Sequence, residues 1–123
     1  MTVKECYEQA VAVIPEVPED NTDMQKFAVT WCNILLAETF PYENAFRKGK
    51  GIPLLSEVPK VREETEEIPY NDSMVRAAFP YGMARWVLRE NEDISGSHEY
   101  YQLYSFALTE SVPAFFAEIE DCC

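Results

Sequence analysis

The sequence lacks most of the residue patterns by which catalytic and cofactor sites are recognised. It has one histidine, His98, and four glycines among its 123 residues. It has no histidine pair at metal-binding spacing, no Gly-x-Ser-x-Gly nucleophile motif, no redox Cys-x-x-Cys and no complete glycine-rich phosphate loop. No pattern therefore argues for catalysis, and we expect a protein that is not an enzyme and has no catalytic, metal-binding or cofactor-binding residues.

Long apolar runs are missing too. No stretch is long enough to cross a bilayer, and the N-terminus lacks the charged-then-apolar pattern of a secretion signal. Apolar residues still make up 47% of the chain, and 123 residues suit one domain better than two. We expect a single domain over residues 1–123, made in the cytoplasm and without a membrane partner.

The four cysteines do not have the spacing of a metal site. Cys122 and Cys123 are adjacent, which is not the gap of a zinc-binding pair, and His98 has no cysteine near it in sequence. Cys6 and Cys32 lie on apolar faces of predicted helices, where cysteine packs as a small hydrophobic residue. Without a secretion signal we expect reduced thiols, and we expect no structural zinc.

Basic residues are scarce. Ten Lys and Arg against 22 Asp and Glu give a net charge of −12. Such a surface repels phosphate, so tight DNA binding is not expected, although the wall of a channel along which DNA slides would benefit from the same repulsion. Like charges also oppose association of identical subunits. We expect the isolated chain to be a monomer or a small oligomer, and added salt to favour self-association.

Among the patterns that are present, residues 68–89 are the most informative. Two apolar stripes follow helical spacing, namely Met74, Ala77, Tyr81, Ala84 and Leu88, and then Val75, Phe79, Gly82 and Trp86. A helix that is apolar on two sides must be covered on two sides, which predicts a central position in a small bundle. The side chains expected to be mostly buried are those of Met74, Ala78, Tyr81, Ala84, Trp86 and Leu88.

Three local signals should shape this central helix. Asn71 or Asp72 can cap its start by accepting hydrogen bonds from free backbone N–H groups. Pro80 removes a backbone donor and crowds the carbonyl group of Arg76, so we expect a kink there. Gly82 has no side chain and would let a neighbouring helix come close.

Two helices are predicted before the central one. The first has a capping box formed by Thr2 and Glu5 and should end near Ile14, because a proline follows that residue. The second should start near residue 21, and Pro41 is expected to end or kink it. A further turn or two can follow this proline, since proline suits the first position of a new helix.

Two polar features of the second helix have structural explanations. Asn33 lies among apolar residues, and we expect it to be a hydrogen-bonded core residue or a partner contact rather than a catalytic one. Residues 47–51, Arg-Lys-Gly-Lys-Gly, form the one basic cluster in the sequence. They lack the glycine spacing, the final Ser or Thr and the following helix of a phosphate loop, so we expect a solvated loop tip.

Residues 52–68 are expected to form a long extended connection, with a short β-hairpin as one alternative. Its prolines are Pro53 and Pro59, with Pro69 just after it. Its acidic run, residues 63–67, should be solvated, because acid–base chemistry would need a cleft that desolvates one carboxylate. Connections of this length are usually functional or mobile, so we expect residues 49–67 to be the most mobile part and the first to be cut by a protease.

The last helix can be capped by Ser95 or Ser97, and it carries Tyr100, Tyr101 and Tyr104 near its start. These tyrosines can pack in the core or share an interface, because each has one polar end. Pro113 should divide the helix and leave residues 114–120 as a separate turn. The whole chain is therefore predicted to be a single all-α domain, a small bundle of four to five helices with the long connection between the second and third.

Two phrases around the central helix resemble a pattern in small virion proteins of tailed bacteriophages and prophages. They are Ile-Pro-Tyr-Asn-Asp at residues 68–72 and Arg-Ala-Ala-Phe-Pro-Tyr-Gly-Met-Ala at residues 76–84. Residues 33–38, the mid-chain linker and the tyrosine-rich last helix are similar to the same group, which includes head–tail connector or adaptor proteins. The resemblance covers roughly the whole chain.

The resemblance implies a virion structural protein at the head–tail interface, made in the host cytoplasm. Such a protein forms a ring below the portal, usually with twelve-fold symmetry. The ring extends the DNA channel without binding DNA specifically and docks the next connector or tail protein. Residues 52–68 would then reach an adjacent subunit or the portal. The alternative is a small acidic phage-encoded protein–protein interaction module with no ring-forming role.

Overall fold

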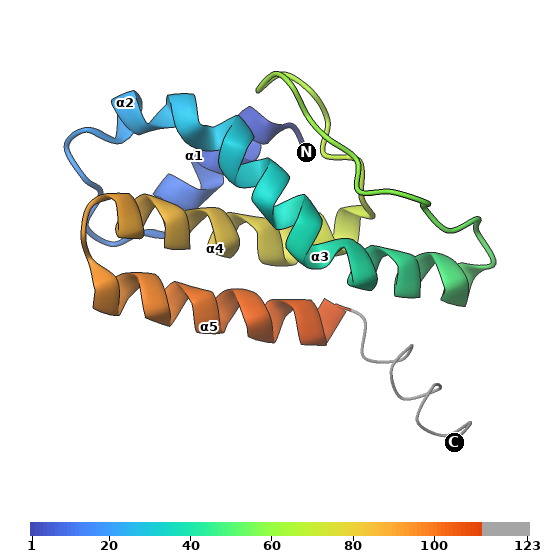
Figure 1. Ribbon diagram of the computed structural model, residues 1–123. Coiled ribbons are helices and arrows are strands. Elements are labelled where there is room, and N and C mark those ends of the chain that lie inside the picture. The colour runs from blue at the N-terminus through green and yellow to red at the C-terminus, as the bar shows by residue number, and fades with distance from the viewer. Residues whose placement is uncertain (112–123) are drawn as a thin grey trace.

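The computed structural model describes residues 1–111, which are all-α as the sequence predicts. The elements are α1 (Val3–Val13), α2 (Asn21–Met24), the 3-10 turn η1 (Gln25–Phe27), α3 (Ala28–Lys50), α4 (Asp72–Glu90) and α5 (Ile94–Ser111). Figure 1 shows α4 and α5 running antiparallel, with α3 crossing α4. The predicted break at Pro113, the turn at 114–120, and Cys122 and Cys123 lie outside the described residues.

Helix α4 occupies the predicted central position, in contact with α1, α3 and α5. Four of the six side chains expected to be buried are buried, namely Met74, Ala78, Ala84 and Leu88. Tyr81 and Trp86 are only partly buried, and Ala77, from the first predicted stripe, is exposed. The apolar surface of α4 is therefore covered on several sides, but a strip near Ala77 and Tyr81 stays open to solvent.

At Gly82, side chains of α3 and α5 pack directly against the backbone of α4, as the sequence suggests. A Cβ atom placed there would come within 2.7 Å of Leu35 Cδ2 and 2.9 Å of the Tyr104 ring. Leu35 and Tyr104 are both buried, so neither side chain can easily move away. The missing side chain thus permits three helices to meet at one point.

The predicted caps of α1 and α4 are both present. The Thr2 side chain accepts a hydrogen bond from Glu5 N (3.1 Å), and the Glu5 carboxylate accepts one from Thr2 N (2.9 Å). The Asn71 side chain accepts from Met74 N (3.0 Å) at the start of α4. Helix α1 ends with Ile14 as its C-cap, where it was predicted to end.

Pro41 does not end the second helix, which was one of the two outcomes expected for this residue. Helix α3 continues through Pro41 to Lys50 and is capped by Gly51, whose φ is 71°. Residues 47–50 are therefore the last helical turn and not a loop tip, and they are followed by no helix that could bind phosphate. Basic residues suit a helix C-terminus and glycine suits the left-handed cap, which explains why the helix extends this far.

The start of α5 also differs from the prediction. Ser95 and Ser97 lie inside the helix, and the Asp93 carboxylate takes the capping role by accepting a hydrogen bond from Gly96 N (2.9 Å). Ser97 is buried, and its hydroxyl donates to Arg85 O (3.0 Å). Serine and aspartate are both good caps, and the tight turn after α4 places the aspartate at the helix end.

Residues 51–71 connect α3 to α4 and are called the connecting segment below. Within the described residues they contain no hairpin, and the one β-bridge pairs Glu67 with Thr2 at the N-terminal end of the chain. Figure 1 shows the segment running from the far end of α3 back past the N-terminus to α4. Its prolines explain why no ladder forms, since each removes a backbone donor.

Candidate interaction surfaces

Within the described residues, the histidine and cysteine side chains do not come together in a reactive site. No group of three His, Cys, Asp or Glu side chains within residues 1–111 could hold a metal ion. His98 is exposed, and its Nε2 lies 3.3 Å from the side chain of Gln102. Cys6 and Cys32 are free and buried, as predicted, and burial raises the pKa of the Cys32 thiol to about 12 and that of Cys6 further. These thiols are unreactive at neutral pH because the thiolate is the nucleophile.

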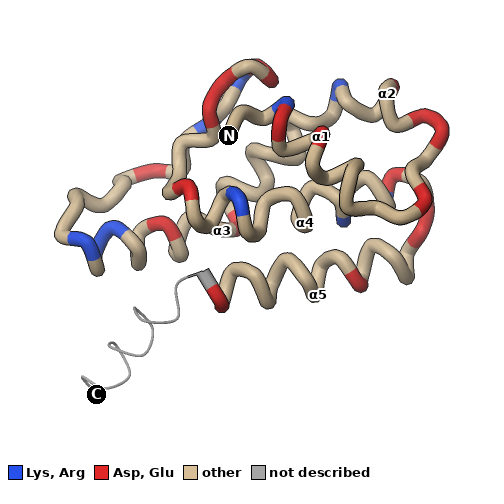
Figure 2. The backbone as a smooth tube through the Cα atoms, turned by 180° about the vertical axis from the view of Figure 1, so that it is seen from behind, with Lys and Arg blue, Asp and Glu red and all other residues tan. Residues whose placement is uncertain are grey.

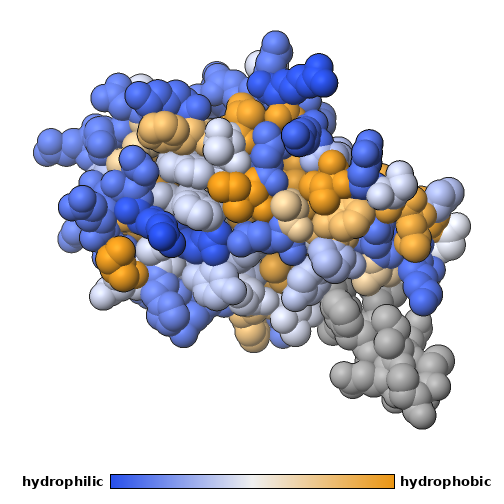
Figure 3. All heavy atoms as spheres, viewed as in Figure 1, coloured by the Kyte–Doolittle hydropathy of each residue, from blue (hydrophilic) through white to orange (hydrophobic). Residues whose placement is uncertain are grey.

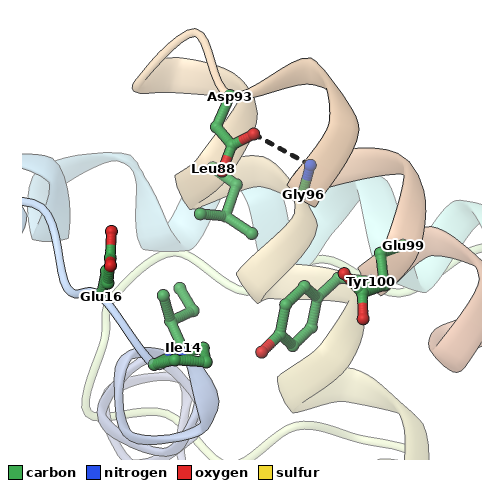
Figure 4. Close-up of a pocket in the computed structure, with 8 residues that line it drawn as sticks. Ile14, Glu16, Leu88, Asp93, Gly96, Glu99 and Tyr100 are labelled. Carbon is green, nitrogen blue, oxygen red and sulfur yellow. Dashed lines mark hydrogen bonds between the residues drawn. The ribbon is translucent and has the colours of Figure 1, made fainter.

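A small acidic cavity of about 270 Å³ lies between the end of α1 and the turn from α4 to α5. Figure 4 shows Ile14 and Leu88 at its apolar side, with Glu16, Asp93 and Glu99 around it. Asp93 is already occupied in capping α5, as the dashed line to Gly96 indicates. The remaining carboxylates would repel an anionic ligand, and no cation-binding group of acids forms there.

A cluster of aromatic rings surrounds Arg85 where α3, α4 and α5 meet. Its guanidinium carbon lies 4.6 Å from the ring centroid of Trp86, 5.1 Å from that of Tyr101 and 5.7 Å from that of Tyr104. Its Nη2 is 3.4 Å from the carboxylate of Glu38 on α3. Cation–π contacts of this kind stabilise half-buried arginines, so the cluster ties the three helices together.

The tyrosines of α5 divide between core and surface. Tyr104 is buried and its hydroxyl donates to Glu38 Oε1 (3.1 Å), while the Tyr100 hydroxyl donates to Val13 O (2.6 Å) on α1. Burial raises the pKa of Tyr104, and the nearby Glu38 carboxylate acts in the same direction. Tyr101 is exposed beside Arg85. Tyr100 and Tyr104 therefore pack in the core, and a share in an interface stays a prediction for the exposed Tyr101.

The joint between the connecting segment and α4 is built around a buried carboxylate. Glu43 on α3 is only 2% exposed. Its Oε1 accepts hydrogen bonds from Asn71 N (2.6 Å) and Asn71 Nδ2 (3.0 Å), and its Oε2 accepts from Arg47 Nε (2.7 Å). Next to it, the Tyr70 hydroxyl donates to Leu36 O (2.6 Å). A buried charge with three donors is well satisfied, so this joint fixes where α4 begins.

Asn33 holds the second half of the connecting segment, residues 61–71. Its amide donates to Val61 O (2.9 Å) and accepts from Val61 N (2.9 Å), so it satisfies both backbone groups of a buried residue. This agrees with the expectation of a hydrogen-bonded core asparagine. Ile68 and Tyr70 are also buried, which places apolar side chains of this half in the core of the protein.

The same half supplies acceptors to the start of α1. Glu66 O accepts from Val3 N (3.1 Å), and Glu64 O accepts from Lys4 N (2.8 Å). These donors are among the N–H groups that a helix leaves free in its first turn. The acidic run was expected to be solvated, but only Glu63 and Glu67 are exposed, while Glu64 and Glu66 are half-buried. Backbone contacts therefore hold the run against the protein, and two carboxylates add to them: Glu67 pairs with the N-terminal ammonium (2.7 Å), and Glu64 accepts from Gln25 Nε2 (3.1 Å).

The first half of the connecting segment, residues 52–60, is held less firmly. Asn44 pairs with both backbone groups of Leu55, at 2.8 and 3.1 Å, and Arg47 donates to Pro53 O (3.2 Å). Three aliphatic side chains of this half, the aliphatic stretch below, nevertheless point to solvent: Ile52 is 42% exposed, Leu54 56% and Val58 38%. Figure 3 shows apolar surface along α3 and the adjacent segment. The aliphatic stretch is one candidate interaction surface.

A second apolar surface lies between α4 and α5. This α4–α5 groove, of about 570 Å³, is lined mainly by Ala77, Tyr81, Leu103, Phe106, Ala107 and Glu110. Phe106 is 65% exposed and Leu103 40% exposed, which is unusual for large apolar side chains on one helix face. The open strip of α4 near Ala77 and Tyr81 forms its other wall. An apolar groove bordered by polar side chains is typical of a binding site for another protein.

Charge differs sharply between these two surfaces. Of the chain's 10 basic and 22 acidic residues, residues 44–60 hold four basic and one acidic. Figure 2 shows the resulting patch of Lys and Arg at the end of α3. Helix α5, by contrast, has two acidic residues, Glu99 and Glu110, and no Lys or Arg. The aliphatic stretch therefore lies in a basic region, and the α4–α5 groove lies beside an acidic helix.

Two structural residues, Glu43 and Asn44, and the exposed Phe106 of the groove were not identified from the sequence. Glu43 and Asn44 follow Pro41, which was expected to end or kink the helix, so the sequence did not predict that both face the connecting segment from α3. The signal was present, because Leu36, Thr39 and Glu43 continue one helical stripe. The exposure of Phe106 could not have been found in this way, since it depends on which face of α5 the other helices cover.

No helix in residues 1–111 is both long and apolar enough to span a membrane. Comparisons with protein-family models, with curated proteins and with solved structures find no match for this chain.

Proposed function

We propose that this chain is a structural subunit of a tailed-bacteriophage or prophage virion. In this proposal it assembles into a ring below the portal, usually twelve-fold, extends the DNA channel and docks the next connector or tail protein. The resemblance of residues 68–84 to small virion proteins supports the phage origin. The helical bundle supplies a rigid wedge, and the first half of the connecting segment, residues 52–60, reaches a neighbouring subunit or the portal.

The observation that carries the proposal is the presence of two separate apolar surfaces on one small chain. A closed ring needs two different surfaces on each subunit, since each subunit contacts one neighbour on either side. The aliphatic stretch with Leu54 and the α4–α5 groove with Phe106 meet this need, because they belong to different elements and differ in charge.

The residues of the resembling phrases serve the fold, which fits a structural protein. Ile68 and Tyr70 are buried, Asn71 caps α4, and Gly82 permits close packing of three helices. The net charge of −12 suits a wall along which DNA slides, because repulsion of phosphate prevents sticking. It also opposes self-assembly in solution, so the portal would act as the template for the ring.

The test mixes purified portal rings, from the phage or prophage that encodes this chain, with the purified protein. We expect a stoichiometric complex with a ring of added density in electron micrographs, and no measurable binding to double-stranded DNA at physiological salt. Tight DNA binding without affinity for the portal would contradict the proposal. Binding to neither would favour the alternative of a small interaction module with no ring-forming role.

A further inference from the structure

The two apolar surfaces have complementary character. The aliphatic stretch projects Ile52, Leu54 and Val58, with Leu54 56% exposed, from an irregular backbone that can enter a groove. The α4–α5 groove offers a space of about 570 Å³ lined by alanine, leucine and aromatic side chains. A projecting aliphatic segment and an apolar groove of this size can form the two sides of one protein–protein interface.

The charges around the two surfaces indicate that the groove binds the aliphatic stretch of a second copy of this chain. The aliphatic stretch is preceded by Lys48 and Lys50, which are exposed and have no ion-pair partner among the described residues. The groove has Glu110 in its lining, on a helix without Lys or Arg. Two copies with net charge −12 repel each other overall. Docking the aliphatic stretch of one copy into the groove of the other reduces this repulsion, because it brings the basic region of one copy to the acidic helix of the next.

We propose that in the assembled ring the aliphatic stretch of one copy docks into the α4–α5 groove of the next copy, with Lys48 and Lys50 facing Glu110. This inference rests on the proposed function and specifies the contact between its subunits. The contact is heterologous, because each copy offers the stretch to one neighbour and the groove to the other. Repetition of such a contact closes into a ring when the rotation between copies permits it.

Cysteine trapping tests this arrangement. In a full-length background with Cys122→Ser and Cys123→Ser, the single variants Leu54→Cys and Leu103→Cys are prepared separately, mixed at high concentration and raised salt, and oxidised. Both positions are exposed, whereas Cys6 and Cys32 are buried with raised thiol pKa values and do not compete. We expect a disulfide-linked dimer from the mixture and little from either variant alone. The matched control replaces Leu54→Cys with Val17→Cys, another exposed apolar position.

Two further variants sharpen the test. Phe106→Ser in the groove partner should lower the trapped yield about tenfold, the effect of one central apolar anchor. In a repeat at low salt, where exposed charge pairs are less screened, Lys50→Glu in one copy should also lower the yield, and pairing it with Glu110→Lys in the other should restore it. Rescue of this kind would not follow from a general loss of folding.

The outcomes separate this inference from the proposed function. A mixture yield no higher than the Val17→Cys control, both without and with portal rings present during oxidation, overturns the head-to-tail contact even if the protein binds portal rings. A dimer formed by Leu103→Cys alone also overturns it. Conversely, a specific trapped dimer from a protein that does not bind the portal supports the contact and contradicts the role below the portal.

Discussion

In the second half of the connecting segment, residues 61–71, the chain is fastened to the core. Asn33 satisfies both backbone groups of Val61, Glu43 fixes Asn71, and the side chains of Ile68 and Tyr70 are buried. The first half, residues 52–60, also lacks regular secondary structure but leaves its aliphatic stretch in water. The difference shows that a segment without regular secondary structure can still divide into a structural part and a part open to a partner.

The substitution expected to lower the free energy of unfolding most is Glu43→Ala, which removes one attachment of the second half of the connecting segment to α3. The substitution removes the acceptor of three hydrogen bonds and leaves Arg47 and the Asn71 N–H without their partner. Removing one member of a buried ionic group costs about 3–5 kcal/mol, so the free energy of unfolding should fall by that amount in urea denaturation. Asp72→Ala is the control, because its ion pair with Arg76 is exposed. An equal loss in both variants would contradict this account.

Asn33→Ala and Asn44→Ala compare the two halves directly. Both asparagines pair with the N–H and C=O groups of one residue in the segment, but Val61 is buried and Leu55 is only partly buried. Loss of the Asn33 side chain leaves two buried groups unpaired and should cost about 2–3 kcal/mol, while Asn44→Ala should cost about 1 kcal/mol because water replaces the lost bonds. Equal costs would mean that the halves are held alike.

These same residues show which features of the fold can be predicted from the sequence. The caps at Thr2 and Asn71, the central place of α4 and the role of Gly82 were predictable, because each depends on local pattern or on a helix that is apolar on two sides. Glu43 and Asn44 were not, because the local rule for Pro41 was outweighed by tertiary contacts further along α3. The groove beside Phe106 depends on how helices pack, which periodicity alone does not determine.

At alkaline pH, the buried cysteines and tyrosines should make the free energy of unfolding depend on pH, an effect smaller than those above. Burial raises the pKa of Cys6, Cys32, Tyr70 and Tyr104. Above pH about 9 the unfolded chain loses protons that the folded chain keeps, so stability should fall as pH rises from there. In urea denaturation at several pH values, Tyr104→Phe should show a shallower fall above pH about 10, the ordinary tyrosine value.

The smallest expected effect on stability is that of Leu54→Ser. This side chain is largely exposed, so the free energy of unfolding should change by less than about 0.5 kcal/mol. Limited proteolysis should still cut first within residues 52–60 in both the variant and the original chain. Binding to portal rings, however, should weaken in the variant. A large loss of stability would show that the aliphatic stretch belongs to the core of the free protein.

The division of the connecting segment is tested most directly by hydrogen exchange of residues 51–71, followed by mass spectrometry in the free protein and in the portal complex. The account predicts slow exchange in residues 61–71 in both states, because the N–H groups of Val61, Ile68 and Asn71 donate to Asn33 Oδ1, Met1 O and Glu43 Oε1 respectively. It predicts fast exchange in residues 52–60 of the free protein and clear protection in the complex. Fast exchange in residues 61–71, or equal exchange of residues 52–60 in both states, would contradict it.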